Sequence, residues 1–312
     1  MIYLDNAATT RPIGKLHNNW FNSHSPYGTN GEFLVRKSKE IISNYLGCKW
    51  NEIIFGYGGS WGNNVCIKTL YNKYGKVEIS GYDHKSTLEN KYVTIGDNVD
   101  YGMVNNETGE LIKGSKGYDL VQALGKISKS EIRELIKDSE CCCFSGHKIH
   151  SYKGLGWCYI REDIQKYMDI GYMGTEWVDG IWHMGERVEW LERNEGDVID
   201  KNKELRNQLI ECLNNSNLNY KINAISNCIC SLNTGMNNNY VINTLADNNI
   251  YVSAGSACTT GEPSHVLRKM GLTDDEINNT IRISWDSIEN DPDYYDHMED
   301  LVWWLEKIKK DY

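Results

Sequence analysis

The chain has 312 residues, a formal net charge of −10 and a hydrophobic content of 40%. This composition excludes a disordered chain, and the acidic balance argues against direct nucleic-acid binding, which needs a basic face to neutralise phosphates. No apolar run approaches the roughly 20 residues of a membrane helix, and the start MIYLDNAATTRP lacks the features of a signal peptide, so we expect a cytoplasmic protein with no membrane association.

The first half of the chain alternates between predicted helices and strands. Residues 32–46 have helical spacing of their apolar side chains, and Gly47 follows as a stop signal. Residues 52–55 (EIIF) predict a short buried strand, which leads through the glycine-rich GYGGSWGNN into a helix. This order places a helix N-terminus where an anion can bind. Further strands are predicted at 77–80, 102–105, 141–144 and 156–160, and 118–124 continues the sheet or starts a helix.

The second half predicts a different arrangement. Residues 179–213 are mainly helical. Strands are predicted at 227–232, from Tyr251 and at 281–284, and helices at 239–248 and 300–310. We therefore predict an α/β protein with a mostly parallel sheet in a large domain, residues 13–185. The remaining residues, 1–12 and 186–312, are predicted to form a smaller α+β domain.

The cysteines do not suggest a disulfide framework or a metal site. The sequence has ten of them, in a chain expected to be cytoplasmic. Cys228 and Cys230 are two positions apart, Cys141 to Cys143 are contiguous, and there is no CxxC pair. We predict that no metal is bound, and that Cys141 to Cys143 act as small apolar residues of a buried strand.

Lys148 stands just after that strand, in the turn of FSGHKIHSYKGLGW. A lysine at a strand end, in a desolvated pocket, has a lowered pKa and forms Schiff bases. An ordinary surface lysine in a loop is the alternative, and this stretch alone does not exclude it.

Nine segments, taken together, resemble one family. IYLDNAATT, EIIFGYGGSWGNN, DHKSTL, VNNETG, DLVQALGKI, FSGHKIH, GTEWVDGI, SAGSACTTGEPSHVLRKMGL and IRIS occur in the order found in the cysteine desulfurases. These are class V members of the fold type I enzymes that use pyridoxal 5′-phosphate, whose large domain has a seven-stranded type of sheet. Ordered matches of this number are far more specific than any single motif.

The resemblance implies roles for the cofactor-binding residues. Lys148 would hold the cofactor covalently, Asp119 would pair with the pyridine nitrogen, and Gln122 would reach the phenolic oxygen. His84 would stack on the ring and move protons, although a plain loop histidine is the alternative. The phosphate would be bound by Gly59 and Ser60 at a helix start and by the side chains of Ser145 and His147.

Three further residues have implied roles with open alternatives. Thr175 resembles the threonine that reaches the phosphate of the other subunit in a homodimer, or it is a helix N-cap. Arg282 matches the clamp for the substrate carboxylate, or it forms a surface salt bridge. Asn106 would lie near substrate and cofactor, or it shapes a turn.

Cys258 is the implied nucleophile, which would take sulfur from L-cysteine as a persulfide and pass it to an acceptor protein. Small, polar and glycine-containing neighbours surround it, and the SAC…PSHVL pattern resembles the subgroup whose cysteine lies on a flexible loop. The alternative is a structural cysteine.

The chain also departs from the family pattern. His84 and Asn106 are only 22 positions apart, Asn106 and Asp119 only 13, and Trp61 replaces the usual glutamate of the phosphate loop. The segment before Thr175 is reduced, and the loop after Cys258 is shorter. These losses predict a trimmed large domain with bare apolar sheet surface, which some of the ten tryptophans cover in part or a partner protein covers.

We therefore expect a cysteine desulfurase that converts L-cysteine to L-alanine. A selenocysteine lyase or related aminotransferase is one alternative, and a partner-dependent or non-catalytic sulfur-assembly scaffold is another. The sequence does not name the final destination of the sulfur.

Overall fold

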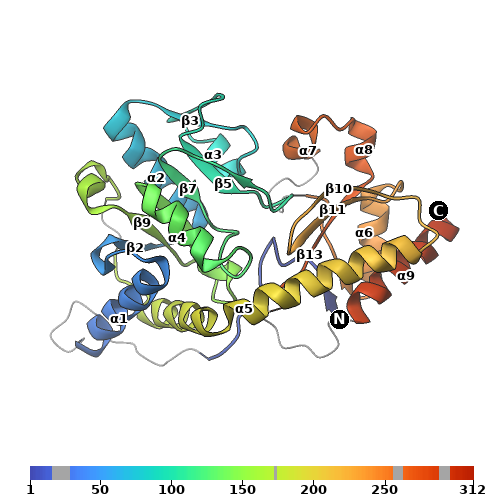
Figure 1. Ribbon diagram of the computed structural model, residues 1–312, viewed down its shortest axis with the longest axis horizontal. Coiled ribbons are helices and arrows are strands. Elements are labelled where there is room, and N and C mark those ends of the chain that lie inside the picture. The colour runs from blue at the N-terminus through green and yellow to red at the C-terminus, as the bar shows by residue number, and fades with distance from the viewer. Residues whose placement is uncertain (16–28, 172–173, 256–262, 288–295) are drawn as a thin grey trace. The chain divides into compact units, whose positions relative to one another are not determined.

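The structure is a computed structural model that describes residues 1–15, 29–171, 174–255, 263–287 and 296–312 (Figure 1). It divides into two compact units. The large unit comprises Thr10–Val104 and Leu111–Glu195, and the small unit comprises Met1–Thr9, Asn105–Glu110 and Gly196–Tyr312. Helix α5, Val178–Asn215, contributes residues to both. The predicted domain limits of 13–185 and of 1–12 with 186–312 stay a prediction.

The large unit contains a six-stranded sheet with the strand order β2-β9-β8-β7-β5-β6. Its strands are β2 (Ile53–Gly56), β5 (Tyr101–Val104), β6 (Leu111–Ile112), β7 (Gly117–Asp119), β8 (Cys141–Ser145) and β9 (Gly156–Ile160). The pairs β5–β7 and β7–β8 are parallel, whereas β2–β9, β8–β9 and β5–β6 are antiparallel. The α/β class is confirmed, and the mostly parallel, seven-stranded sheet is corrected to a mixed one of six strands.

Short connections explain this mixture. A parallel neighbour needs a crossover of a dozen or more residues, whereas an antiparallel neighbour needs only a turn. Residues 105–110 are too few for a crossover between β5 and β6, and residues 146–155 return the chain from β8 to β9. Strands β3 (Val77–Ile79) and β4 (Val93–Ile95) form a separate parallel pair around the one-turn helix α3 (Lys85–Leu88).

Helix α2 (Gly59–Tyr74) packs its buried face against the middle of the sheet. Glycine makes this close approach possible, because a Cβ added at Gly62 would lie 2.6 Å from the Cβ of Cys143. Val65, Cys66 and Leu70 of the helix share one core cluster with Cys141, Cys143, Cys158 and Ile160. Cys141 to Cys143 are fully buried, as expected of apolar strand residues.

The short connections do not leave the central strands bare. Every residue of β5, β7, β8 and β9 is buried. Helices α1 (Thr29–Leu46), α2 and α4 (Lys129–Asp138) belong to this unit (Figure 1). The prediction of bare apolar sheet surface is therefore wrong for these strands.

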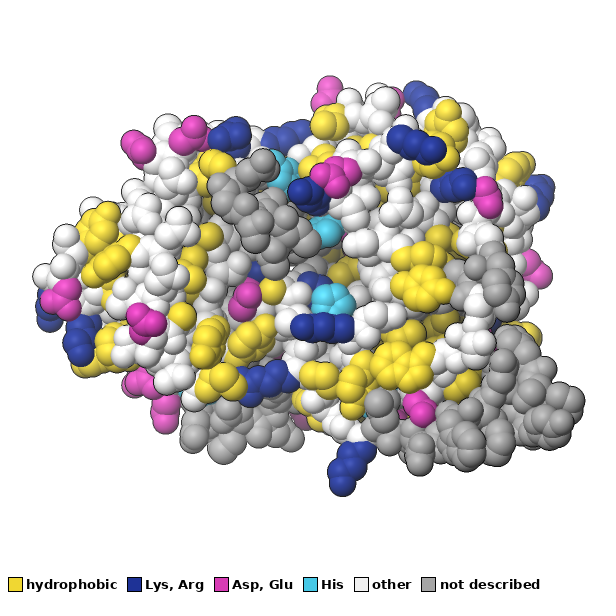
Figure 2. Space-filling model, turned by 180° about the vertical axis from the view of Figure 1, so that it is seen from behind, with side chains coloured by type: hydrophobic (Ala, Val, Ile, Leu, Met, Phe, Trp, Pro, Cys, Tyr) yellow, Lys and Arg dark blue, Asp and Glu magenta, His cyan; other side chains and the backbone are white. Residues whose placement is uncertain are grey.

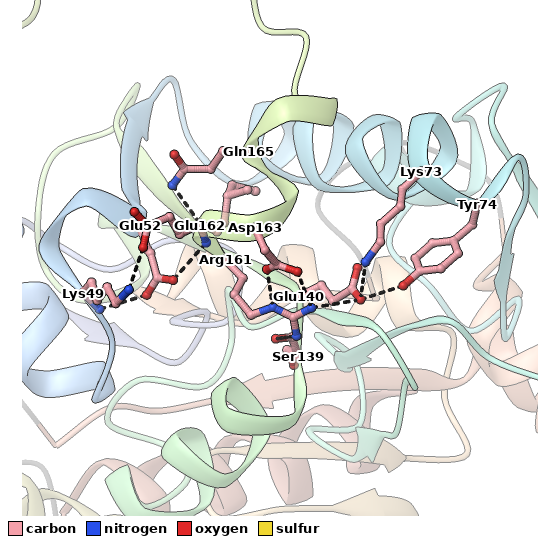
Figure 3. Close-up of polar contacts among 11 residues, drawn as sticks. Lys49, Glu52, Lys73, Tyr74, Ser139, Glu140, Arg161, Glu162, Asp163 and Gln165 are labelled. Atoms are coloured by element: carbon pink, nitrogen blue, oxygen red, sulfur yellow. Dashed lines mark hydrogen bonds and ion pairs between the residues drawn. The ribbon is translucent and has the colours of Figure 1, made fainter.

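A polar network joins the end of β9 to its neighbours (Figure 3). The Glu140 carboxylate accepts hydrogen bonds from Lys73 Nζ at 2.7 Å, Tyr74 Oη at 2.6 Å and Arg161 Nη2 at 3.2 Å. Arg161 also forms an ion pair of 2.6 Å with the exposed Asp163 at the start of the 3₁₀ turn η3 (Glu162–Tyr167). Burial tends to raise the pKa of Glu140, but these donors hold it below its ordinary value.

The small unit contains an antiparallel sheet of order β10-β11-β13, covered by helices. The strands are β10 (Lys221–Ile225), β11 (Ile229–Asn233) and β13 (Thr280–Ser284). A separate parallel pair joins β1 (Ile2–Tyr3) to β12 (Ile250–Tyr251). Leucines of α5 pack in one core with residues of α6 (Asn238–Asp247) and α9 (Asp296–Asp311), and the one-turn helices α7 (His265–Lys269) and α8 (Asp274–Asn278) precede β13.

The molecular surface mixes hydrophobic and charged side chains, as Figure 2 shows for one face. Exposed large hydrophobic residues include Phe33, Trp50, Tyr57, Trp177 and Trp303. None of the described helices combines the length and the apolar character that crossing a membrane would need.

Candidate functional site

Lys148 ends the 3₁₀ turn η2 (Gly146–Lys148), directly after the buried strand β8. Lys148 is buried. Its carbonyl oxygen accepts a hydrogen bond of 3.3 Å from the Nζ of Lys126, which is also buried. The same turn is held by the N-terminal segment, because Thr10 donates its N–H and its hydroxyl to the carbonyl of His147 at 2.9 and 3.1 Å. Lys148 is therefore not an ordinary surface lysine in a loop.

An anion-binding feature lies beside this turn. Helix α2 starts at Gly59, and Gly58 before it adopts a φ of 118°, a backbone conformation that suits glycine. The hydroxyl of Ser145 lies next to this loop, since a Cβ at Gly58 would be 3.6 Å from its Oγ. This buried Oγ has no hydrogen-bond partner among the described residues. The N–H groups at a helix start and a buried hydroxyl can together receive a phosphate.

His147 is neutral in this setting. Burial, together with the positive charges of Lys148, Lys153 and Lys126, lowers the pKa of its imidazole to about 3. A neutral imidazole keeps one nitrogen as a hydrogen-bond donor and leaves the other as an acceptor. His147 can therefore contact an anion by one hydrogen bond without carrying a charge.

Asp119 stands at the carboxyl end of β7, beside β8 in the parallel register Asp119–Cys143. Its Oδ1 accepts from the backbone N–H of Val121 at 3.0 Å, and its Oδ2 accepts from Nδ2 of Asn63 at 2.7 Å. Gln122 is buried in the turn that follows. Asn63 comes from the glycine-rich motif, but its contact with Asp119 was not foreseen from the sequence.

His84 caps the one-turn helix α3. Its Nδ1 accepts the backbone N–H of Ser86 at 3.2 Å, and the Ser86 Oγ lies 2.8 Å from the same nitrogen. Since Nδ1 is an acceptor in these contacts, a neutral imidazole carries its proton on Nε2. These local contacts give His84 a structural role as the N-cap of α3, and its stacking on the ring and proton transfer stay a prediction.

Arg282 lies on β13 in the small unit and is 2% exposed. Its Nη2 forms an ion pair of 2.7 Å with Asp5, and its Nη1 donates to the backbone oxygen of Asn106 at 3.0 Å. Its Nε has no hydrogen-bond partner among the described residues. Burial rules out the alternative of a surface salt bridge. The two bonds use two of the five guanidinium N–H groups, so other N–H groups, Nε–H among them, are left for a ligand. Asp5 belongs to the segment IYLDNAATT, but its pairing with Arg282 could not be read from the sequence.

The turn that contains Asn106 is shaped by its neighbour. Oδ1 of Asn105 accepts the backbone N–H groups of Glu107 and Thr108 at 2.8 and 3.0 Å, so Asn105 forms the turn. This leaves the side chain of Asn106 for another role. The Glu107 carboxylate accepts from Ser264 Oγ at 2.6 Å and lies close to Gly255, where an added Cβ would be 3.2 Å from its Oε2.

The last two predicted site residues are placed less fully. Thr175 is exposed in the single chain, and α5 starts three positions later at Val178, so the structure does not favour an N-cap role. Cys258 lies outside the described residues. Gly255 and Ser264, which flank that segment, both lie against Glu107.

Together, the large-unit residues fit pyridoxal phosphate. They supply a buried lysine, a helix N-terminus beside an unpartnered buried hydroxyl, a neutral histidine and a carboxylate held by two donors. Asn106 and Arg282 belong to the small unit. No cluster of His, Cys, Asp and Glu side chains suited to a metal ion occurs within the parts of the chain that the structure describes.

Comparison with known proteins agrees with this chemistry. The profile of the family "Aminotransferase class-V" matches residues 106–291. A cysteine desulfurase of Trichormus variabilis is 28% identical, over 91% of this chain and 88% of that protein. The solved structure of a NifS-like protein superposes with a TM-score of 0.83 at 22% identity and full coverage of both chains. The structure titled "SspA in complex with cysteine" has a TM-score of 0.71 at 22% identity, covering 91% of this chain and 98% of that one.

Proposed function

Because this chain belongs to the class V aminotransferase family, we propose that it is a pyridoxal phosphate-dependent cysteine desulfurase. It converts L-cysteine to L-alanine and hands the sulfur to an acceptor protein. The observation that carries the proposal is the buried Lys148, which follows Ser145 by one turn, while the unpartnered hydroxyl of Ser145 lies beside Gly58 at the start of α2. The cysteine bound to SspA and the name of the Trichormus protein support L-cysteine as substrate.

Each cofactor-binding residue has one task in this proposal. When bound, pyridoxal phosphate supplies an electron sink that weakens bonds at the substrate's α-carbon. Lys148 would hold it and, with His84, would move protons. Asp119 would pair with the pyridine nitrogen, and Gln122 would reach the phenolic oxygen. Gly59, Ser60, Ser145 and His147 would bind the phosphate by N–H, hydroxyl and imidazole groups.

The substrate and sulfur step uses the other predicted residues. Arg282 binds the substrate carboxylate through its remaining N–H groups, and Asn106 lies beside it. The Cys258 thiolate attacks the sulfur of the substrate. An S–S bond forms, the Cβ–S bond breaks, and Cβ gains a proton. L-alanine leaves and a persulfide remains on Cys258, so atoms and electrons balance without an oxidant.

A homodimer completes the site in this proposal, with Thr175 reaching the phosphate of the partner subunit. Support comes from the exposure of Thr175 and of the nearby Trp177, which a second copy would cover. Sedimentation of the wild type and of Trp177→Ala measures whether each is a dimer. A monomeric wild type would contradict the proposal. The cytoplasm is the proposed location, because the buried Cys141, Cys142 and Cys143 of β8 are free thiols, as in a reducing compartment.

Alanine formation from L-cysteine tests the function. Cys258→Ala should retain the visible absorbance of the bound cofactor and lose alanine formation. Cys212→Ala, a partly buried cysteine of α5, is the matched control and should keep both. Full activity of Cys258→Ala would overturn the nucleophile assignment, and a wild type that turns over no cysteine with its cofactor bound would overturn the function.

A further inference from the structure

Asn63 is a buried residue to which the proposed function assigns no role. It lies in the second turn of α2, is 1% exposed, and contacts residues from four other segments of the large unit. Its two amide hydrogens and its amide oxygen are all engaged. An amide in such a setting has one defined orientation, because reversing it would place the amide oxygen against the carboxylate of Asp119.

The donor side of Asn63 faces two groups. Nδ2 donates to Asp119 Oδ2 at 2.7 Å and to Ser86 Oγ at 3.0 Å. The Asp119 contact is in the short range typical of donors to carboxylates. With the Val121 N–H on Oδ1, it fixes the rotation of the Asp119 carboxylate from both oxygens.

The acceptor side of Asn63 is held by two further buried residues. Its Oδ1 accepts from Tyr101 Oη at 2.9 Å and from Cys143 Sγ at 3.0 Å. Burial raises the pKa of both the Tyr101 hydroxyl and the Cys143 thiol well above their ordinary values, so both remain protonated donors. Tyr101 and Cys143 thus hold the amide oxygen in place, and the amide N–H groups point at Asp119 and Ser86.

The same amide reaches His84 through one hydroxyl. Ser86 Oγ accepts from Asn63, so its own proton is free to point at His84 Nδ1, 2.8 Å away. The backbone N–H of Ser86 also donates to Nδ1. All donors run in one direction, from Asn63 through Ser86 to His84, and place the imidazole proton on Nε2.

We propose that Asn63 is a positioning residue of the cofactor site. It holds the carboxylate of Asp119 in one orientation and, through Ser86, keeps Nε2 of His84 as the nitrogen that carries the proton. One buried amide therefore couples the group that faces the pyridine nitrogen to the group that stacks on the ring. The inference rests on the proposed function for the roles of Asp119 and His84, but not for the contacts among them.

Asn63→Asp compared with Asn64→Asp tests the Asp119 half. The first variant places a second carboxylate beside Asp119, and two such groups share a proton or repel. Asn64 is the exposed neighbour that bonds the Ser60 carbonyl and Asn90. Titrating cofactor-free protein with pyridoxal phosphate, we expect affinity about tenfold or more weaker for Asn63→Asp and changed less than about twofold for Asn64→Asp. Equal affinities would overturn the proposal.

The ring nitrogens of His84 test the other half without cofactor. In ¹⁵N spectra of cofactor-free wild type, we expect the Nε2–H tautomer, and in Ser86→Ala a mixture with Nδ1–H. A wild type with Nδ1–H, or no change in Ser86→Ala, would overturn the link even if Asn63→Asp does not fold. A wild type that binds no pyridoxal phosphate would instead count against the proposed function, while the tautomer would still report on the Asn63–Ser86–His84 chain.

Discussion

The guanidinium of Arg282 lies 2.7 Å from the carboxylate of Asp5, although the two residues are 277 positions apart in the chain. Asp5 forms a parallel bridge to Ser284 near the end of β13, the strand that carries Arg282. Because Arg282 is buried, its positive charge needs the compensating charge of this partner. Asp5 therefore sets both the orientation of the guanidinium and the number of N–H groups left for a substrate carboxylate.

Asp5→Asn should weaken substrate binding more than turnover. The amide cannot hold the guanidinium by charge, so we expect the KM for L-cysteine to rise about tenfold and kcat to fall less, with a stability loss of about 3 kcal/mol. Asp274→Asn makes the same change in an exposed ion pair with Arg268 and should alter neither. Steady-state alanine formation measures both constants. An unchanged KM in Asp5→Asn would remove Asp5 from substrate recognition.

Arg161 pairs with two carboxylates, and losing the largely buried Glu140 should destabilise the protein more than losing the exposed Asp163. Glu140→Gln weakens three hydrogen bonds in a largely buried network, for which we expect a loss of roughly 1–3 kcal/mol in the free energy of unfolding (Figure 3). Asp163→Asn breaks an exposed pair and should cost at most about 1 kcal/mol. Urea denaturation at pH 7 decides between them. Equal losses of unfolding free energy in the two variants would mean that the contacts of Glu140 stabilise the protein no more than an exposed ion pair does.

Acid should destabilise the protein through His147. The pKa of this imidazole is lowered to about 3, so the unfolded chain binds a proton below about pH 6.5 while the folded chain does not. Stability therefore falls as the pH drops through this window, by roughly 2 kcal/mol between pH 7 and pH 5. His147→Gln should flatten that slope in urea denaturation of cofactor-free protein. An identical slope in the variant would contradict the assignment.

Asp83 acts in the opposite direction. Burial raises the pKa of its carboxyl to about 6, so the folded chain keeps a proton that the unfolded chain loses above about pH 3.8. Its contribution to stability is present at low pH and is lost as the pH rises towards 6. Asp83→Asn should therefore steepen the net acid destabilisation that His147 causes. The two single variants, measured over the same pH range, should change the slope with opposite signs.

The cysteines of β8 should be chemically silent in the folded protein. Burial raises the pKa of Cys141, Cys142 and Cys143 well above the ordinary thiol value, and all three side chains are inaccessible. A thiol-reactive reagent, followed by peptide mass spectrometry, should label them only after unfolding in urea. Partly exposed Cys48 and Cys212 provide the positive control. Labelling of the strand in the folded protein at the rate of Cys48 would contradict its buried placement.

Most elements could be predicted because their signals are local. The strand of residues 156–160, the helix that follows the glycine-rich loop and the long helix of 179–213 are each set by a run of apolar residues and its flanking turns. Helix α4 was missed, although Ser128 and Glu131 form a capping box that the sequence displays. Strands β4 and β6 could not be identified, because they are short and partly exposed and so lack an apolar pattern.

The site was predictable residue by residue, but its supports were not. Lys148, Asp119 and His84 each lie in a short motif that is recognised from its neighbouring residues. The partners Asn63 and Asp5 contact residues 56 and 277 positions away, and only the folded chain brings such pairs together. The sheet order has the same origin, since trimming the connections changes which neighbours a strand can reach without altering its own pattern.

The small unit is assembled from three separate stretches of chain, and this has a consequence for synthesis on the ribosome. Strand β1 leaves the ribosome long before its partner β12 at Ile250–Tyr251, and the turn of 105–110 also needs residues of the C-terminal half. A translating ribosome thus releases Ile2 and Leu4 long before their core exists. The large unit can form during translation once Glu195 is made, whereas the small unit must wait for the residues of Gly196–Tyr312. Ribosome stalling before Tyr251 should yield nascent chains in which a protease cleaves the first ten residues.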